Sequence, residues 1–269
     1  MTQGKLTLIG LGLYSEKDVS IKGLEQIKSC NKVFAEFYTS KLIGTTIENI
    51  EKTIGKKIQV LSRKETEKAD TIINAAKKGH VCFLTAGDPM TATTHIDLRI
   101  RAEKQDILTK VIHSSTVISA VPGILGLQNY KFGRTTTLAY PEGDYFPTSP
   151  LDVIADNQKI GLHTLVLLDI QEDKNRYMTA NEGLKFLLEM EKKVGKKIIS
   201  KESLVCVVAR AGSDDAVVRA DEVKNLLDFD FGSPLHSLVV PGKLHFMEIE
   251  ALEVFAQLPA QQMKKLQKI

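Results

Sequence analysis

The segment Val81–Met90, which reads Val-Cys-Phe-Leu-Thr-Ala-Gly-Asp-Pro-Met, constrains the fold of this chain more than any other. Its apolar and small residues predict a short buried strand over 81–85, closed by a glycine turn. Asp88 and Pro89 are typical of a helix N-cap and first helical position, so we expect a helix over about 91–104. A polar turn between a buried strand and a helix is where open α/β folds hold small ligands.

The same succession of apolar run, small-residue turn and helical pattern recurs along the chain. Strand followed by helix, repeated, implies a mainly parallel sheet with helices on its faces. We therefore predict an α/β protein of two α/β domains, 1–113 and 114–269, with a ligand cleft between them, and an ordered loop over 140–150. The further turns are Gly10–Leu13, Ala120–Gly123, Ala209–Ser213 and Pro241–Lys243. Strands are expected at 5–10, 32–36, 81–85, 111–113, 135–139, 163–168, 204–208 and 237–240, and further helices at 21–27, 69–76, 179–193 and 244–257.

Composition narrows the class of protein. Hydrophobic residues make up 43% and charged residues 26% of the 269 residues, as in soluble globular proteins, and no apolar run is long enough for a membrane helix. Three widely spaced cysteines and no signal-peptide pattern over 1–20 predict buried thiols in a reducing cytoplasm. Lysine pairs are typical of solvated helix ends. The alternative, a basic surface for an acidic protein or RNA, has little support because tryptophan is absent and the net charge is only +3.

Several catalytic classes lack their motifs. Gly10-x-Gly12 is the start of a dinucleotide fingerprint, but Ser15 stands in place of its third glycine, which leaves NAD binding as a minor alternative. No phosphate loop, metal-ligand spacing or nucleophile elbow is present, so we predict no metal and name no catalytic residue. Taken alone, His95 and His236 are interpreted as structural or surface histidines. Glycine-rich strand ends bind ligands largely through backbone groups, which suits an adenosine-type cofactor.

Six segments, spread in order over nearly the whole chain, resemble the diphthine synthases, a family of tetrapyrrole-methylase-like methyltransferases. The Gly-Asp-Pro turn is shared with relatives that methylate porphyrin precursors or ribosomal RNA, whereas Ala35–Ser40 and Val240–His245 point to the diphthamide pathway. The segments are Ile9–Tyr14, Ala35–Ser40, Leu84–Pro89 with Ala92–His95, Tyr140–Gly143, Met178–Glu182 and Val240–His245.

The resemblance implies a cytoplasmic homodimer of the tetrapyrrole-methylase fold, with S-adenosylmethionine bound between the two α/β domains. The implied substrate is translation elongation factor 2, whose 3-amino-3-carboxypropyl-histidine receives three methyl groups on its amine to give diphthine. Three alternatives stay open: a ribosomal RNA methyltransferase, a tetrapyrrole methyltransferase of the same fold, and a non-catalytic S-adenosylmethionine-binding subunit.

Residues are assigned to two sites, the acceptor site from the acid, aromatic ring and hydroxyl groups of Ala35–Ser40 after a strand end, and the cofactor site from the resemblance. Glu36 and Tyr38 are hypothesised to shape the acceptor pocket; alternatively, Glu36 pairs with a lysine and Tyr38 packs at a domain seam. Asp88 is either a cofactor contact or only a helix cap. The cofactor contacts, carried over by motif position, are Leu13, Asp88, Thr91, Thr116, Val117, Leu168, Ala211 and His236.

Overall fold

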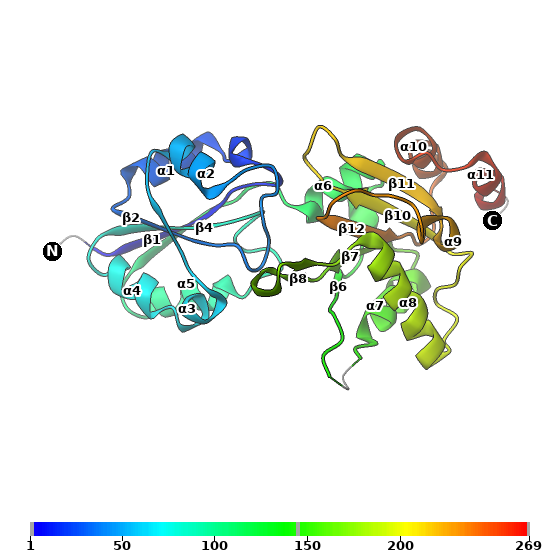
Figure 1. Cartoon of the computed structure of the whole chain (residues 1–269), viewed down its shortest axis with the longest axis horizontal. Helices are drawn as coiled ribbons and strands as arrows, with labels where there is room; N and C mark the ends of the chain where they lie inside the picture. Colours follow the sequence, from blue (N-terminus) through cyan, green and yellow to red (C-terminus); the bar gives the residue numbers. More distant parts are fainter. Residues whose placement is uncertain (1–2, 144–145, 268–269) are drawn as a thin grey trace. The chain divides into compact units, whose positions relative to one another are not determined.

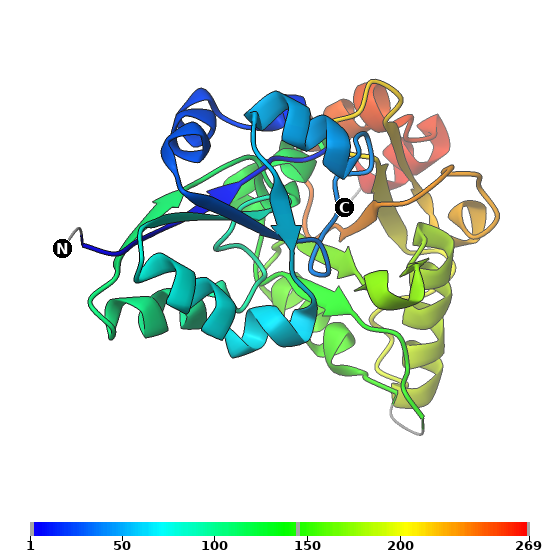
Figure 2. The same ribbon diagram turned by 60° about the vertical axis from the view of Figure 1, so that its left-hand side comes forward.

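The computed structural model describes residues 3–143 and 146–267, and it divides the chain into two compact units, Met1–Val117 and Ile118–Ile269 (Figure 1). Each unit contains one five-stranded sheet with helices packed on it, as a second view also shows (Figure 2). No helix in the described part of the chain is long and apolar enough to cross a membrane. The three cysteines are buried free thiols.

The first unit is built on a fully parallel sheet with strand order β3-β2-β4-β1-β5. The predicted strands at 5–10, 32–36 and 81–85 are confirmed to within a residue. Because all five strands run the same way, their carboxyl ends lie at one edge of the sheet. The strands are β1 (Lys5–Gly10), β2 (Lys32–Glu36), β3 (Ile58–Val60), β4 (His80–Thr85) and β5 (Leu108–Ile112).

Both faces of this sheet are covered by helices, which explains its continuous apolar strands. In β4, Val81 and Phe83 pack into the core beneath α4 and α5, whereas Cys82 and Leu84 pack into the core beneath α1 and α2. Figure 1 shows these two helical layers on opposite sides of the strands. The helices are α1 (Ile21–Ser29), α2 (Ile47–Ile54), α3 (Arg63–Lys68), α4 (Asp70–Ala76) and α5 (His95–Glu103), with a 3-10 turn η1 (Glu16–Asp18).

The second unit has a mixed sheet with strand order β11-β10-β12-β7-β6, in which only β6 and β7 are parallel. The prediction of a mainly parallel sheet is wrong here, because β10 returns as β11 through the short turn 210–216 instead of through a helix. The strands are β6 (Thr136–Leu138), β7 (Thr164–Leu168), β10 (Leu204–Ala209), β11 (Val217–Glu222) and β12 (His236–Val240), beside a small hairpin of β8 (Ile170–Gln171) and β9 (Arg176–Tyr177).

Helices also cover the second sheet. One face packs against α7, α8 and α9 to form a single core, and α6 and α10 lie on the other side (Figure 1). The predicted loop over 140–150 ends early, because Pro150 occupies a favoured position in the first turn of α7; positions 144–145 lie outside the described residues. The helices are α6 (Val117–Leu125), α7 (Ser149–Lys159), α8 (Ala180–Val194), α9 (Val223–Leu226), α10 (Phe246–Ala256) and α11 (Ala260–Leu266), with 3-10 turns η2 (Asn129–Lys131) and η3 (Glu172–Lys174).

Candidate functional site

Two glycine turns meet at the carboxyl edge of the first sheet. The backbone N–H of Gly87 donates to the carbonyl of Gly12 at 2.7 Å, and the N–H of Gly12 donates back to Gly87 at 3.3 Å. A Cβ at Gly10 would lie 2.4 Å from the Gly87 oxygen, so only glycine allows this approach. The turns after β1 and β4 are thereby held together, and they carry Leu13 and Asp88, two of the predicted cofactor contacts.

Asp88 acts as a clamp between the ends of β4 and β5. Its Oδ1 accepts from the N–H of Met90 at 2.9 Å, while its Oδ2 accepts from the N–H of Ser114 at 3.1 Å and from Nδ1 of His113 at 2.9 Å. Burial alone raises the pKa of Asp88, but these hydrogen bonds outweigh it and hold the pKa below its usual value. The side chain is therefore an ionised carboxylate at neutral pH.

The predicted start of the helix after Asp88 is wrong. Helix α5 begins at His95, with Thr94 as its N-cap, and not near residue 91. Ala92 adopts a left-handed conformation with φ of 53°, which a helix cannot contain. Asp88 thus caps a turn and not a helix, and Thr91 lies in that turn with its hydroxyl 3.4 Å from Asp88 Oδ1.

Thr116 and Val117, which follow β5, belong to the same edge. A Cβ built on Gly87 would find only the Thr116 hydroxyl nearby, at 3.9 Å, so the backbone of this turn faces open space beside Thr116. Because β1 lies between β4 and β5 in the sheet, five of the predicted cofactor contacts lie at one edge of the first unit. Two of them, Thr116 and Val117, were predicted for the second domain but belong to the first compact unit. The five residues are Leu13, Asp88, Thr91, Thr116 and Val117.

The three contacts predicted in the second unit also share one sheet edge. Antiparallel pairing places Ser237 opposite Leu167 and His236 opposite Ala209, so the ends of β7 and β10 flank the start of β12. Leu168 closes β7, and Ala211 lies in the turn after β10. The topology therefore brings together residues that are far apart in the sequence.

The environment of His236 limits what its ring can do. Nδ1 accepts from the N–H of Ala180 at 3.0 Å, and Nε2 lies 3.0 Å from the carbonyl of Ser233. Burial lowers the pKa of His236 to about 4, so the imidazole is neutral. Since both ring nitrogens are used within the unit, the imidazole of His236 has no free nitrogen to offer a ligand.

The edge of the first unit fits an adenosine-type cofactor in two observable ways. A Cβ at Gly87 would meet only the Thr116 hydroxyl, at 3.9 Å, and the Asp88 carboxylate has an exposed imidazole, that of His113, as its side-chain partner. In residues 3–143 and 146–267, by contrast, no group of three or more metal-binding side chains comes together.

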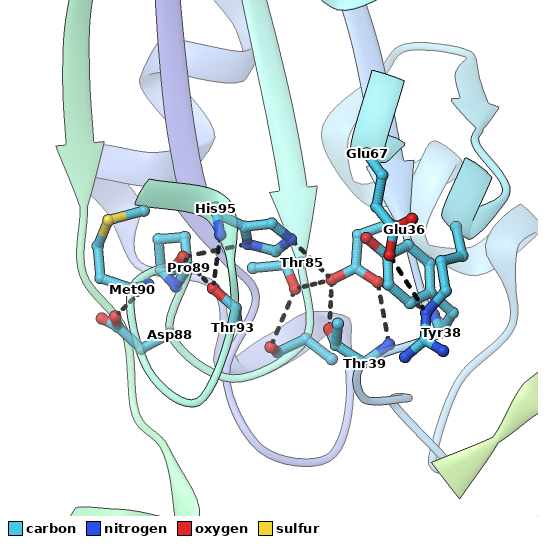
Figure 3. Close-up of polar contacts among 12 residues, drawn as sticks. Glu36, Tyr38, Thr39, Glu67, Thr85, Asp88, Pro89, Met90, Thr93 and His95 are labelled. Carbon is cyan, nitrogen blue, oxygen red and sulfur yellow. Dashed lines mark hydrogen bonds and ion pairs between the residues drawn. The ribbon is translucent and has the colours of Figure 1, made fainter. Parts of the chain in front are cut away.

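Glu36, at the end of β2, is fully buried and is held by four hydrogen bonds (Figure 3). Its Oε2 accepts from the N–H groups of Tyr38 at 3.0 Å and Thr39 at 3.1 Å, and its Oε1 accepts from the hydroxyl groups of Thr39 and Thr85. In the part of the chain that the structure describes, the partners of Glu36 are these backbone and hydroxyl groups and not a lysine. Glu36 fixes the loop that carries Tyr38.

His95, which the sequence suggested to be a structural or surface histidine, is a buried neighbour of Glu36. The ring is 2% exposed, with Nε2 3.5 Å from Glu36 Oε1 and Nδ1 3.1 Å from the carbonyl of Pro89 (Figure 3). The adjacent strands β2 and β4 place Glu36 beside Thr85, and the turn after β4 returns the chain to His95. The contact between Glu36 and His95 therefore follows from the pairing of β2 with β4, which local sequence patterns do not reveal.

A cavity of about 300 Å³ lies beside this pair within the first unit. The Thr66 hydroxyl in its wall is buried and has no hydrogen-bond partner. Burial and the nearby charge of Glu36 raise the pKa of Tyr38 to about 12, so its hydroxyl stays protonated and is able to donate. The cavity is lined by Tyr38, Thr66, Glu67, Thr94, His95, Asp97 and Leu98.

Comparison with known proteins gives a consistent result. Residues 5–227 match the family model described as tetrapyrrole (corrin/porphyrin) methylases. The chain is 52% identical to a diphthine synthase of Methanococcus maripaludis over 92% of this chain and 97% of the relative. It is 51% identical to a diphthine synthase of Methanocaldococcus jannaschii over 94% of this chain and 99% of the relative.

A solved structure agrees with the sequence relatives. A crystal structure of diphthine synthase superposes with a TM-score of 0.88 at 38% identity, covering 96% of this chain and 98% of the other. The two α/β domains are thus of the tetrapyrrole-methylase type. The chain belongs to the diphthine synthase family and is an S-adenosylmethionine-dependent methyltransferase.

Proposed function

We propose that this chain methylates the amine of the 3-amino-3-carboxypropyl-histidine of translation elongation factor 2, three times, to give diphthine. The observation that carries the proposal is the similarity to proteins named diphthine synthase, at about half identity over nearly their full length. Three methyl groups on one amine make a quaternary ammonium, so the reaction on nitrogen ends there by valence. A cytoplasmic location accompanies this proposal.

For the methyl donor, we propose S-adenosylmethionine, contacted by the strand-end residues of the two sheet edges. When bound, the sulfonium supplies an electrophilic methyl group and leaves as S-adenosylhomocysteine. Leu13, Thr116 and Val117 offer apolar and hydroxyl contacts near the open Gly87 turn, and Asp88 offers a carboxylate oxygen once His113 moves away. Leu168, Ala211 and His236 supply the contacts of the second domain. Orientation of the reactants contributes most of the catalysis in such a displacement.

For the acceptor, we propose the cavity beside Tyr38. A protonated amine suits its lining, because the Tyr38 hydroxyl and the unpartnered Thr66 hydroxyl offer oxygen acceptors, and the carboxylates of Glu67 and Asp97, each beside an arginine, lie in the same wall. Glu36 shapes this site indirectly by holding the Tyr38 backbone. An ordinary α-amine has a pKa near roughly 8, so a useful neutral fraction exists at cellular pH without a strong base.

We further propose that the chain forms a homodimer through the outer face of α10. Phe246, Met247, Val254 and Phe255 of this helix are each more than half exposed, which is unusual for a cluster of large apolar side chains. Light scattering of the wild type should give twice the chain mass, and Val254→Glu should shift it to the monomer. A monomeric wild type at micromolar concentration would contradict the proposal.

The decisive experiment on the function is transfer of labelled methyl groups to elongation factor 2 that carries the aminocarboxypropyl-histidine. We expect three methyl groups per modified histidine and none on the unmodified factor. Label on purified ribosomal RNA or on a tetrapyrrole precursor, and none on the factor, would indicate the corresponding relatives of the fold. Cofactor binding by calorimetry without transfer to any acceptor would indicate a non-catalytic subunit.

A further inference from the structure

The pair formed by Glu36 and His95 needs more protons than a neutral histidine provides. Nδ1 of His95 lies 3.1 Å from the carbonyl of Pro89, and a carbonyl only accepts hydrogen bonds, so Nδ1 carries a proton. A neutral imidazole has no second proton. Its Nε2 would then present a lone pair to Glu36 Oε1 at 3.5 Å.

This arrangement is unfavourable where both groups are buried. Glu36 is 0% and His95 is 2% exposed, and the Phe83 ring packs edge-on against the imidazole with centroids 5.1 Å apart. Water therefore does little to screen the repulsion between a lone pair and a carboxylate. Burial lowers the pKa of His95, although the Glu36 charge and the Pro89 carbonyl oppose this shift, so the imidazole alone does not readily hold a second proton. One further proton within the contact turns the repulsion into a hydrogen bond and makes the pair electrically neutral.

In the described part of the chain, the charged side chains of α3 and α5 near this pair are directed to other groups. Arg63 of α3 lies 3.7 Å from Glu67 and 5.3 Å from the Tyr38 ring centre, so its charge is directed to them. Asp97, in the first turn of α5, lies 3.5 Å from Arg101. The donors that reach Glu36 are the neutral hydroxyl and N–H groups of Tyr38, Thr39 and Thr85.

We propose that His95 is a positioning residue of the acceptor pocket, and that one proton shared by His95 and Glu36 holds the pocket in its active form. The inference rests on the proposed function. Glu36 holds the N–H groups of Tyr38 and Thr39, while His95 forms part of the cavity wall. Loss of the shared proton at high pH drives the two side chains apart and displaces Tyr38 from the cavity.

The substitution Glu36→Gln tests this directly, because it imitates the protonated pair. The amide oxygen takes the place of Oε2, and the amide nitrogen donates its two hydrogens to a bare Nε2 of His95 and to one of the hydroxyl groups of Thr39 and Thr85, which turns to accept. The control is Glu103→Gln, which makes the same chemical change at an acid on α5 that accepts from Thr109.

We expect the ratio of kcat/KM of the wild type to that of Glu36→Gln to fall at alkaline pH. Above the pH at which His95 and Glu36 lose their shared proton, the fall should be about tenfold per pH unit. Protonation of the acceptor amine cancels in this ratio. The ratio of Glu103→Gln to wild type should stay constant. A constant ratio of Glu36→Gln to wild type from about pH 6 to about pH 10 would overturn the proposal.

His95→Gln separates positioning from cofactor binding. We expect a raised KM for the modified elongation factor with an unchanged affinity for S-adenosylmethionine, and loss of cofactor affinity in the folded variant would contradict the assignment. A readout independent of turnover is the pair of backbone N–H resonances of Tyr38 and Thr39. They should move with alkaline pH in the wild type and not in Glu36→Gln. If the Tyr38 and Thr39 resonances move with pH while the wild type transfers no methyl group at any pH, the proposed function is wrong. The proposal of a proton shared by His95 and Glu36 is then still supported.

Discussion

Glu248 and His163 in the second domain form a buried pair in which each atom has a compatible partner, whereas Glu36 and His95 in the first domain do not. His163 Nδ1 accepts from the N–H of Gly242 at 3.0 Å, so its single proton lies on Nε2 and is donated to Glu248 at 3.0 Å. Lys131 adds a cation to the same carboxylate. In the first domain the histidine meets a carbonyl at Nδ1, and no lysine or arginine is bonded to Glu36 in the described part of the chain.

The difference shows that two glutamate–histidine contacts of similar burial have different consequences. The pair of the second domain is complete with one imidazole proton and a lysine, and it fixes the segment 241–245 by also accepting from the N–H of His245. The pair of the first domain is complete only with an additional proton. A structural role suits the pair of the second domain, and a role that depends on pH suits the pair of the first domain.

The largest expected effect is the contrast between two glutamine substitutions. Glu248→Gln places an amide N–H against the donors Lys131, His163 and the backbone, and should lower the free energy of unfolding by about 3 kcal/mol. Glu36→Gln should lower it by less than about 1 kcal/mol, because its new N–H faces a nitrogen that accepts. Urea unfolding of both variants measures the contrast, and equal losses would break the comparison.

Acid should destabilise the protein through the pair Glu248–His163 of the second domain. Burial raises the pKa of Glu248, but the N–H groups of His245 and Gln128, with Lys131 and His163, outweigh burial and lower the pKa to about 2. The stability that this carboxylate contributes is fully present above its usual pKa of 4.5 and is lost as the pH falls towards 2. Denaturation at a series of pH values should show this loss in the wild type and a flatter profile in Glu248→Gln.

Asp88 and His113 form a third carboxylate–histidine pair, in which the imidazole is exposed. Asp88→Ala leaves the N–H groups of Met90 and Ser114 without their acceptor and should lower the free energy of unfolding by about 2 kcal/mol. It should also weaken S-adenosylmethionine binding in calorimetric titrations at a temperature where the variant is folded. His113→Ala is the control, with a stability change under about 0.5 kcal/mol. Unchanged cofactor affinity in Asp88→Ala would leave Asp88 a purely structural role.

Tyr38→Phe should have the smallest effect, confined to the acceptor side. Loss of one hydroxyl hydrogen bond to the substrate should reduce kcat/KM about three- to tenfold, with the affinity for S-adenosylmethionine unchanged. Comparison of Tyr38→Phe with Glu36→Gln thus separates the contribution of the Tyr38 hydroxyl from that of the proton shared by His95 and Glu36, which positions Tyr38. A rate for Tyr38→Phe equal to that of the wild type across the pH range would remove Tyr38 from the acceptor site.

Local patterns in the sequence predicted the strands and the glycine turns well, because alternate burial of Val81, Cys82, Phe83 and Leu84 requires a strand covered on both faces. Local patterns failed where pairing between segments distant in the sequence determines the structure. The antiparallel return of β10 to β11 and the start of α5 after Ala92 are two such cases. Helix α2 was not predicted although it carries local signals, the N-cap Thr46 and the left-handed Gly55 at its end. The Glu36–His95 contact joins two strand ends through sheet register, so no motif contains both residues.

The most direct test of the account is a count of protons on the buried histidines by nuclear magnetic resonance of protein labelled with ¹⁵N-histidine and ¹³C-glutamate, with His95→Gln and Glu36→Gln for assignment. At neutral pH we predict one proton on His163, at Nε2, and a proton on His95 Nδ1 together with one more on Nε2 or on the Glu36 carboxyl. A bare Nε2 of His95 beside an ionised Glu36 would contradict the account.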